Sequence, residues 1–261
     1  MNEKIAFFVS IAHDIRTPLT LVKAPLDELR QDSTLHADAI RSIGLAHSNL
    51  NKLLDILSQL LDFERIDHSS MNPKMEAVPL KQNIDNLFTI FQPLCQQQQK
   101  TLQASSINCQ LGVWADSKLL DRILTNLLSN ALKYTPAGGK ISIDVKAEAD
   151  KVQIIVSDTG IGISPKEQKK LFTSFFRASN AISSGTPGIG LGLLQAKRFA
   201  TLLKGDIKVN SIVNQGSEFM LILNKAAVTA SAVPTTTPIT KDFTTTENTT
   251  FVTRTRIHCS L

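Results

Sequence analysis

Residues 8–20, FVSIAHDIRTPLT, are the stretch that decides how the N-terminal part of this chain folds. Apolar residues recur every three or four positions, which places them on one buried stripe of a helix: Phe8, Ile11, Ile15, Leu19 and, just beyond, Val22. His13 lies off that stripe and shares a face with Thr17, while Asp14 is its immediate neighbour. Pro18 lacks the N–H that would bond the Asp14 carbonyl, so we expect a bend just after the histidine.

The surroundings of His13 favour chemistry over a bland surface position. A lone helical histidine is most often solvated and inert, but here an acid, a hydroxyl and a helix-bending proline lie within about one and a half turns of it. A neutral imidazole is a good nucleophile near neutral pH. If the Asp14 carboxylate holds one ring N–H, the other nitrogen presents its lone pair outward. The stretch therefore predicts a nucleophilic histidine.

The run HDIRTPLT resembles the phosphoacceptor box of sensor histidine kinases, with Asp14 where many members have Glu. The resemblance implies that His13 receives a phosphoryl group and that Asp14 helps to take up its proton. It also implies that Thr17 positions a water for the reverse, phosphatase reaction. A narrower resemblance, of FFVSIAHDIRTPLT, is to the kinase core of the hybrid two-component systems of gut Bacteroides.

Composition favours a soluble globular protein. The 261 residues are 42% hydrophobic and 20% charged, and the net charge of +5 is scattered without a basic block, which gives nucleic-acid binding no support. Three cysteines show no metal-ligand spacing, and their odd number argues against a disulfide framework. No apolar run is long enough to span a bilayer, and no signal-peptide pattern opens the chain. We expect a cytoplasmic location, with any membrane attachment supplied by flanking sequence.

Residues 1–68 predict an antiparallel helical hairpin. A first helix covers about 4–30, and after a polar break a second runs to about Asp67. The second keeps a heptad spacing of apolar residues: Ile43, Ala46, Leu50, Leu53, Leu57 and Leu60. One hairpin cannot bury such wide stripes, whereas two hairpins paired as a four-helix bundle can. We therefore expect a homodimer, as the family resemblance also implies; an intramolecular bundle or a docking surface for the next domain stays open.

Beyond a proline-containing linker at 69–79, residues 80–225 predict a mixed domain. Its predicted helices are Leu80–Gln99, Ser117–Tyr134 and Leu191–Leu203, and its predicted strands are Val113–Ala115, Ile141–Ala147, Lys151–Ser157, Asp206–Val213 and Glu218–Leu223. Hairpin-connected strands interleaved with helices indicate one helix layer on a mixed sheet, an α+β fold. Residues 226–261 are Thr-rich and predict a disordered tail or a linker.

Four clusters carry the chemistry of this domain, and the first is DRILTNLLSNALKYT, residues 121–135. Its polar members share one side of a helix: Asn126, Asn130, Lys133 and Tyr134. An amide oxygen suits a hard cation such as Mg²⁺, and a lysine suits phosphate oxygens. Alone, paired asparagines are better explained as an ordinary helix surface.

The other three clusters follow in order along the chain. Asp158-Thr159-Gly160-Ile161-Gly162 closes an apolar strand, where a carboxylate can accept a bond from an exocyclic amine and glycines let a planar ring approach. LFTSFFRA, residues 171–178, offers Arg177 as a phosphate contact, with Phe172 assigned to packing. GTPGIGLG, residues 185–192, offers backbone N–H groups before a helix. No P-loop motif is present in the chain.

In this order the four clusters resemble the N, G1, F and G2 boxes of the histidine-kinase ATP-binding domain, a GHKL or Bergerat-type α/β sandwich. The resemblance spans residues 2–223. It implies that ATP and Mg²⁺ are the cofactors, that Asn130 is the metal ligand, and that Lys133 and Tyr134 touch phosphates.

The same resemblance gives roles to the later boxes. Asp158 would bind adenine and Gly162 would line its pocket, with Gly160 in the same loop. Residues 164–186 would form a mobile lid that closes over the nucleotide and excludes water. The lid hinge would be glycine, at Gly188, Gly190 and Gly192.

Asn126 separates this chain from relatives that hydrolyse ATP. Gyrase B and mismatch-repair proteins carry a Glu four residues before the metal-binding asparagine to activate water, whereas an amide cannot accept a proton at neutral pH. Transfer of the phosphoryl group to a side chain is therefore favoured over transfer to water. The resemblance implies that His13 is the acceptor and that a receiver-domain aspartate, in cis or in trans, receives the group next. Two other functions stay open: a catalytically silent nucleotide-binding scaffold and a free-standing GHKL ATPase. The remaining histidines are predicted to be surface or core residues.

Overall fold

The computed structural model describes residues 15, 19–23, 25–27, 29, 36–67, 71–105, 107–173, 176–183 and 190–227. Four of the predicted site residues lie outside these ranges: His13, Asp14, Thr17 and Gly188. The predicted tail after residue 227 also lies outside them.

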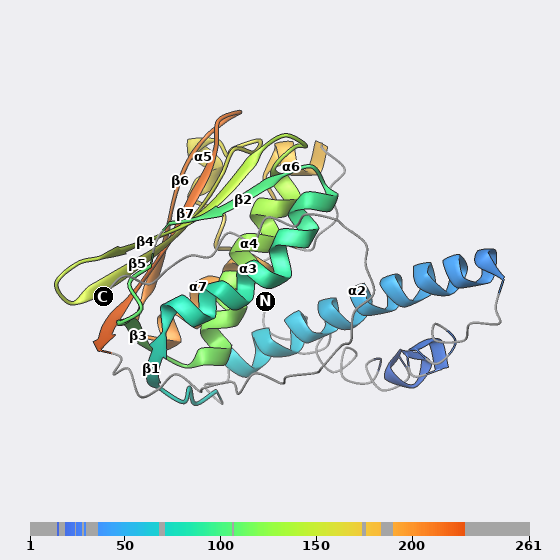
Figure 1. The fold of residues 1–261 in the computed structure, drawn as a ribbon, viewed down its shortest axis with the longest axis horizontal. Helices are drawn as coiled ribbons and strands as arrows, with labels where there is room; N and C mark the ends of the chain where they lie inside the picture. The colour runs from blue at the N-terminus through green and yellow to red at the C-terminus, as the bar shows by residue number, and fades with distance from the viewer. Residues whose placement is uncertain are drawn as a thin grey trace, which may run out of the picture.

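In the N-terminal region, the described residues 15, 19–23, 25–27 and 29 are helical, and residues 37–67 form the long helix α2, Ala37–Asp67. His47 of α2 pairs with Asp27 of the preceding helical turns, with 2.7 Å between Nε2 and Oδ1. The two helical segments therefore lie side by side, as the predicted hairpin requires (Figure 1). Within one chain the heptad stripe is only partly covered, since Leu50 is buried while Leu53 is 48% exposed.

The C-terminal domain is built on a seven-stranded mixed sheet. Its strand order is β1-β3-β7-β5-β4-β2, and β6 pairs with β7 outside this path. Only β2 and β4 run parallel, and every other pairing is antiparallel. The bounds are β1 Glu76–Pro79, β2 Thr101–Ala104, β3 Leu111–Ala115, β4 Lys140–Ala147, β5 Lys151–Asp158, β6 Asp206–Ile212 and β7 Gly216–Ala227.

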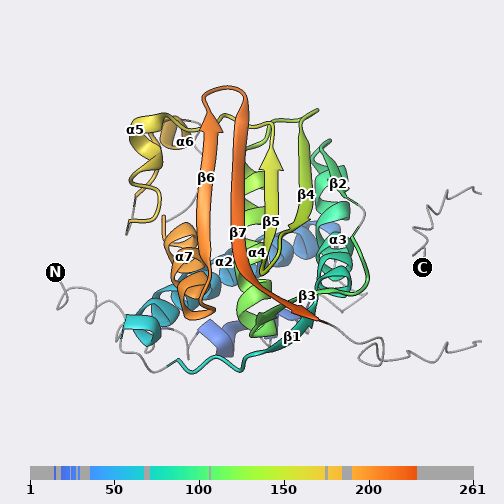
Figure 2. The same cartoon turned by 90° about the vertical axis from the view of Figure 1, so that its left-hand side faces the viewer.

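Helices cover one face of this sheet (Figure 2). The layer consists of α3 Leu80–Gln97, α4 Ser117–Tyr134 and α7 Gly192–Leu202, while the short helices α5 Pro165–Gln168 and α6 Ser179–Ser183 lie near the tip of the β6–β7 hairpin. The core forms between the layers, where alternate sheet residues such as Ile154 and Leu221 meet Leu127 of α4. The α+β fold with one helix layer on a mixed sheet is thus confirmed.

Two features differ from the sequence-based expectation. Residues 76–79, expected in the linker, form edge strand β1, whose proline stands at the last position, where an edge strand tolerates it. Strand β2 was not predicted, because four residues carry little pattern and its parallel pairing with β4 is a tertiary effect. Cys95, one of the described cysteines, is free and buried.

Two features are absent from the described residues. No helix among them combines the length and apolar character needed to cross a membrane. Nor do these residues bring together three His, Cys, Asp or Glu side chains that could hold a metal ion.

Candidate functional site

Helix α4 carries four of the predicted site residues. It begins at the cap residue Asp116, whose Oδ1 accepts from the backbone N–H groups of Lys118 and Leu119 at 3.0 and 3.1 Å. One face of α4 is buried against the sheet and α7, and it includes Ile123, Leu124, Leu127, Leu128 and Ala131. The predicted polar residues are all half-buried: Asn126, Asn130, Lys133 and Tyr134. Polar side chains on a helix face that only meets solvent are usually exposed, so four half-buried polar residues on one face are unusual.

The start of α7 meets α4 at Asn126. A Cβ built on Gly192 would lie 3.1 Å from the Asn126 Oδ1 atom, so the glycine allows the close approach. Gly190, just before the helix, has a φ of +75°, a left-handed conformation that favours glycine. The structure therefore brings the first and fourth sequence clusters together, with Gly188 outside the described residues.

The glycines of the DTGIG loop have a packing role that the sequence did not reveal. A Cβ on Gly160 would lie 2.5 Å from the Tyr134 carbonyl oxygen, and one on Gly162 would overlap the Ile212 carbonyl oxygen at 1.9 Å. Gly162 also has a φ of +63°. The space beside both glycines is thus filled by the chain's own backbone. Close packing is therefore one reason for glycine at both positions; the approach of a planar ring and contact with a nucleotide stay predictions.

Asp158, the last residue of β5, has a perturbed acidity. Burial raises the pKa of its carboxyl to about 6, and hydrogen bonds from the backbone N–H groups of Gly160 and Ser217 partly oppose this rise. The Gly160 bond measures 2.8 Å. Sequence reasoning missed Ser217, because its place beside Asp158 follows from the pairing of β5 with β7. A half-buried carboxylate acceptor suits a ligand that donates N–H groups.

Two cations come together at the C-terminal end of α4. Burial lowers the pKa of the Lys133 ammonium, and the nearby Arg177 guanidinium lowers it further. Burial raises the pKa of the Tyr134 hydroxyl, while the charge of Arg177 and a hydrogen bond from it act in the opposite direction. Arg177 also donates to the Ala181 carbonyl oxygen at 3.2 Å. A half-buried lysine beside an arginine is electrostatically suited to an anion.

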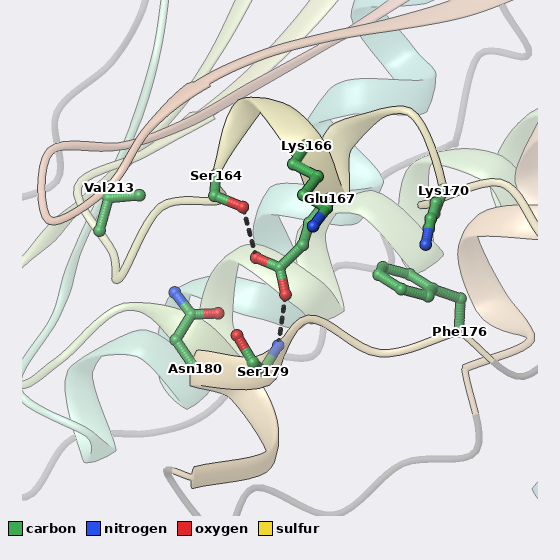
Figure 3. Close-up of a pocket in the computed structure, with 8 residues that line it drawn as sticks. All are labelled: Ser164, Lys166, Glu167, Lys170, Phe176, Ser179, Asn180 and Val213. Carbon is green, nitrogen blue, oxygen red and sulfur yellow. Dashed lines mark hydrogen bonds between the residues drawn. The ribbon is translucent and has the colours of Figure 1, made fainter.

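A pocket of about 520 Å³ lies between the residues of α5 and those of α6 (Figure 3). Its lining includes Lys166, Lys170, Phe176, Asn180 and Val213. None of the predicted nucleotide contacts that the structure describes lines it. Of the third sequence cluster, Phe176 lines the pocket, while Phe172 packs against the core with Lys197 Nζ 5.1 Å from its ring centroid.

The similarity to known proteins follows the same division of the chain. Residues 3–69 match the family described as "His Kinase A (phospho-acceptor) domain". Residues 115–227 match the family described as "Histidine kinase-, DNA gyrase B-, and HSP90-like ATPase".

Curated relatives resemble most of this chain but are far longer. "Hybrid signal transduction histidine kinase D" of Dictyostelium discoideum is 32% identical over 84% of this chain and 15% of its own length. "Sensor histidine kinase GacS" of Pseudomonas protegens is 33% identical over 85% of this chain and 24% of its own length. "Autoinducer 2 sensor kinase/phosphatase LuxQ" of Vibrio vulnificus is 30% identical over 82% and 26%, respectively. The chain thus spans about a quarter or less of each relative's length.

Solved structures share the fold. Full-length ShkA in complex with AMPPNP matches 88% of this chain and 47% of its own, with a TM-score of 0.71 and 23% identity. Histidine kinase AdeS of Acinetobacter baumannii matches 81% of this chain and 97% of its own, with a TM-score of 0.57 and 21% identity. Fold and family matches together define a phosphoacceptor helical region followed by a GHKL-type domain. The chain carries the kinase core of the sensor histidine kinase family.

Proposed function

We propose that this chain phosphorylates itself on His13 from ATP and passes the phosphoryl group to a receiver-domain aspartate. The observation that carries the proposal is an arrangement at the end of α4 in the C-terminal domain. The loop that begins with the half-buried Asp158 carboxylate is bonded there, through the Ile161 N–H and the Tyr134 carbonyl oxygen, and the cations Lys133 and Arg177 lie at the same helix end. The carboxylate suits the amine of adenine, and the cations suit phosphates. Gly160 and Gly162 complete the loop at the adenine end.

The metal would be Mg²⁺, held through the amide oxygen of Asn130. Because the described residues contain no cluster of three His, Cys, Asp or Glu side chains, the rest of its ligands would be phosphate oxygens and water. Such a shell is usual for Mg²⁺, which keeps several waters and binds few protein groups. Asn130 is half-buried on α4, one turn after Asn126 and just before Lys133, and its amide oxygen would serve as this single protein ligand. When bound, the ion neutralises charge that develops on the phosphates.

In the transfer step, a ring nitrogen of His13 attacks the γ-phosphorus, an N–P bond forms and the bond to the ADP oxygen breaks. Asp14 holds the other ring nitrogen and takes up its proton. Lys133, Tyr134 and Arg177 bind the phosphates, and the glycines Gly188, Gly190 and Gly192 let the lid close. Positioning and charge neutralisation account for most of the acceleration in phosphoryl transfer.

Asn126 argues against the ATPase alternative. Its amide cannot act as a general base, and its Oδ1 atom stands against Gly192 of α7. We therefore propose transfer to His13 in place of water attack. For the reverse reaction, Thr17 would position a water for receiver dephosphorylation; the relative LuxQ is named a kinase/phosphatase.

The active form is proposed to be a homodimer whose partner is a receiver domain, in cis or in trans. Support comes from the apolar residues that α2 leaves uncovered in one chain, Leu45 and Leu53.

Mixing an Asn130→Asp chain with a His13→Gln chain tests whether transfer occurs within or between subunits, because label in the mixture requires transfer between subunits. Attachment to a membrane through flanking sequence stays a prediction from the sequence.

The nucleotide site is tested by calorimetric titration of the chain with ATP, with and without Mg²⁺. The parent is expected to bind ATP more tightly when Mg²⁺ is present, and Asn130→Ala is expected to lose that difference. Ser129→Ala, an exposed neighbour on α4, is the matched control. Equal Mg²⁺ dependence in Asn130→Ala and the parent would contradict the assigned ligand.

A further inference from the structure

Asn180 joins the lid to the DTGIG loop. It lies in α6, and its side-chain nitrogen donates to the Gly162 carbonyl oxygen at 2.8 Å. The Ile161 carbonyl oxygen accepts a longer bond from the same nitrogen, at 3.4 Å. The Asn180 Oδ1 atom is buried and accepts no hydrogen bond from the described residues. The donor end of the amide therefore makes the connection.

Glu167 connects the start of α5 to the start of α6, the helix that carries Asn180. Its carboxylate accepts from the Ser164 hydroxyl at 2.7 Å and from the Ser179 backbone N–H at 2.8 Å (Figure 3). These bonds also lower the pKa of the Glu167 carboxyl, so it stays ionised near neutral pH. The start of α5 and the start of α6 are thus fixed to each other, next to Asn180.

The DTGIG loop is anchored on its other sides. The Ile161 N–H donates to the Tyr134 carbonyl oxygen at 3.2 Å, and the Asn214 N–H donates to the Ile161 carbonyl oxygen at 2.9 Å. The loop is therefore fixed both to the end of α4 and to the turn of the β6–β7 hairpin. A bond from Asn180 to Gly162 consequently sets where the lid stands relative to α4.

Arg177 is the residue whose position depends on that bond. It precedes Asn180 by three residues, donates to the Ala181 carbonyl oxygen at 3.2 Å and hydrogen-bonds the Tyr134 hydroxyl. Its guanidinium also acts electrostatically on Lys133. If the lid left the DTGIG loop, Arg177 would leave the cation pair at the phosphate end.

Building on the function proposed above, we propose that Asn180 is a positioning residue for the nucleotide. Its amide donor holds the lid on the DTGIG loop, and this hold keeps Arg177 beside Lys133 where the phosphates of ATP bind. The position requires a donor, because both of its partners are carbonyl oxygens. Asn180→Asp keeps nearly the same shape but sets a carboxylate oxygen against the Gly162 carbonyl oxygen, so it removes the bond with little change in volume.

The experiment compares Asn180→Asp and Asn180→Ala with the parent and with Asn214→Asp. The control makes the same chemical change at an exposed position of the neighbouring turn. Both Asn180 variants are expected to raise the KM for Mg·ATP about tenfold, with kcat at saturating ATP within about threefold of the parent. Hydrogen exchange without nucleotide is expected to quicken in residues 164–173 and 176–183 of both variants and to stay unchanged in Asn214→Asp.

Unchanged KM and unchanged exchange in both Asn180 variants would overturn the proposal, as would an equal effect of Asn214→Asp. A fall in kcat alone, with KM kept, would also overturn it, because positioning of the nucleotide acts on binding. If the parent chain itself bound no nucleotide, the proposed function would fail and the role of Asn180 toward ATP would fail with it. The exchange measurement uses no nucleotide, so it would still decide separately whether Asn180 holds the lid.

Discussion

The protonated form of the Asp158 carboxyl favours the stability of the fold, whereas the ionised form favours the binding of a ligand that donates an N–H group. Burial raises the pKa of its carboxyl from 3.8 to about 6, so the folded chain binds this proton more tightly than the unfolded chain does. Stability contributed by this group therefore falls as pH rises from about 4 to about 6 and stays low above that. An ionised acceptor, by contrast, is what an amine donor needs.

Asp158→Asn is expected to separate the two effects. The free energy of unfolding should rise relative to the parent by about 1–3 kcal/mol at pH 7 and by little at pH 4, because the amide carries no charge to bury. Mg·ATP affinity should fall at least about tenfold, since the charged acceptor is lost. Denaturant unfolding at several pH values and calorimetry measure the two quantities. A variant less stable than the parent at pH 7, or one with full ATP affinity, would contradict this reasoning.

Gly162 and Gly138 allow two reasons for a glycine to be compared, namely a left-handed backbone conformation and close contact with another backbone segment. Both have positive φ, +63° and +80°, but a Cβ on Gly162 would overlap the Ile212 carbonyl oxygen, whereas one on Gly138 meets nothing within 4 Å. Gly138→Ala should cost about 1 kcal/mol of stability from backbone strain alone. Gly162→Ala should cost about 3 kcal/mol or more, because the hairpin tip must also move. Equal losses in thermal or denaturant unfolding would show that the close approach is unimportant.

At the scale of the element, α4 depends on a cap that serves two segments. The Asp116 carboxylate accepts from Lys118 and Leu119 in the first turn of the helix and from the Lys74 backbone N–H at 2.7 Å. Asp116→Ala should lower the free energy of unfolding by about 1–2 kcal/mol. Asp116→Asn, which keeps an acceptor, should cost much less, and denaturant unfolding of the two variants makes the comparison. A loss in Asp116→Asn as large as in Asp116→Ala would exclude capping as the reason.

Some elements of the fold can be predicted from the sequence, and others cannot. Helix α4 was predicted to its bounds, because its apolar residues have a strict helical period. Strand β2 was missed because its parallel partner β4 is distant in sequence. The candidate site follows the same rule: Asp158 was found from its motif, whereas Ser217 and Asn180 reach the DTGIG loop only through tertiary structure. Local patterns are legible in a sequence, and contacts made by folding are not.

At the scale of the whole molecule, α2 leaves apolar side chains for a second copy. Leu45 is 62% exposed and Leu53 48% exposed in a single chain. We expect the parent to be a dimer by light scattering, and Leu53→Glu to shift it toward the monomer because a charge cannot be buried in the seam. Ile90→Glu, at an exposed apolar residue of α3, is the control and should stay dimeric. A parent that is monomeric at high concentration would contradict the dimer.

The central claim, that His13 receives the phosphoryl group of ATP, has one direct measurement. The chain is incubated with ATP labelled at the γ-phosphate and Mg²⁺, and the protein-bound label is followed in acid and in alkali. Label that is acid-labile and alkali-stable is expected in the parent and in His36→Gln, a histidine exposed just before α2, and none is expected in His13→Gln. Label that persists in His13→Gln, or that survives acid and is lost in alkali, would contradict the claim.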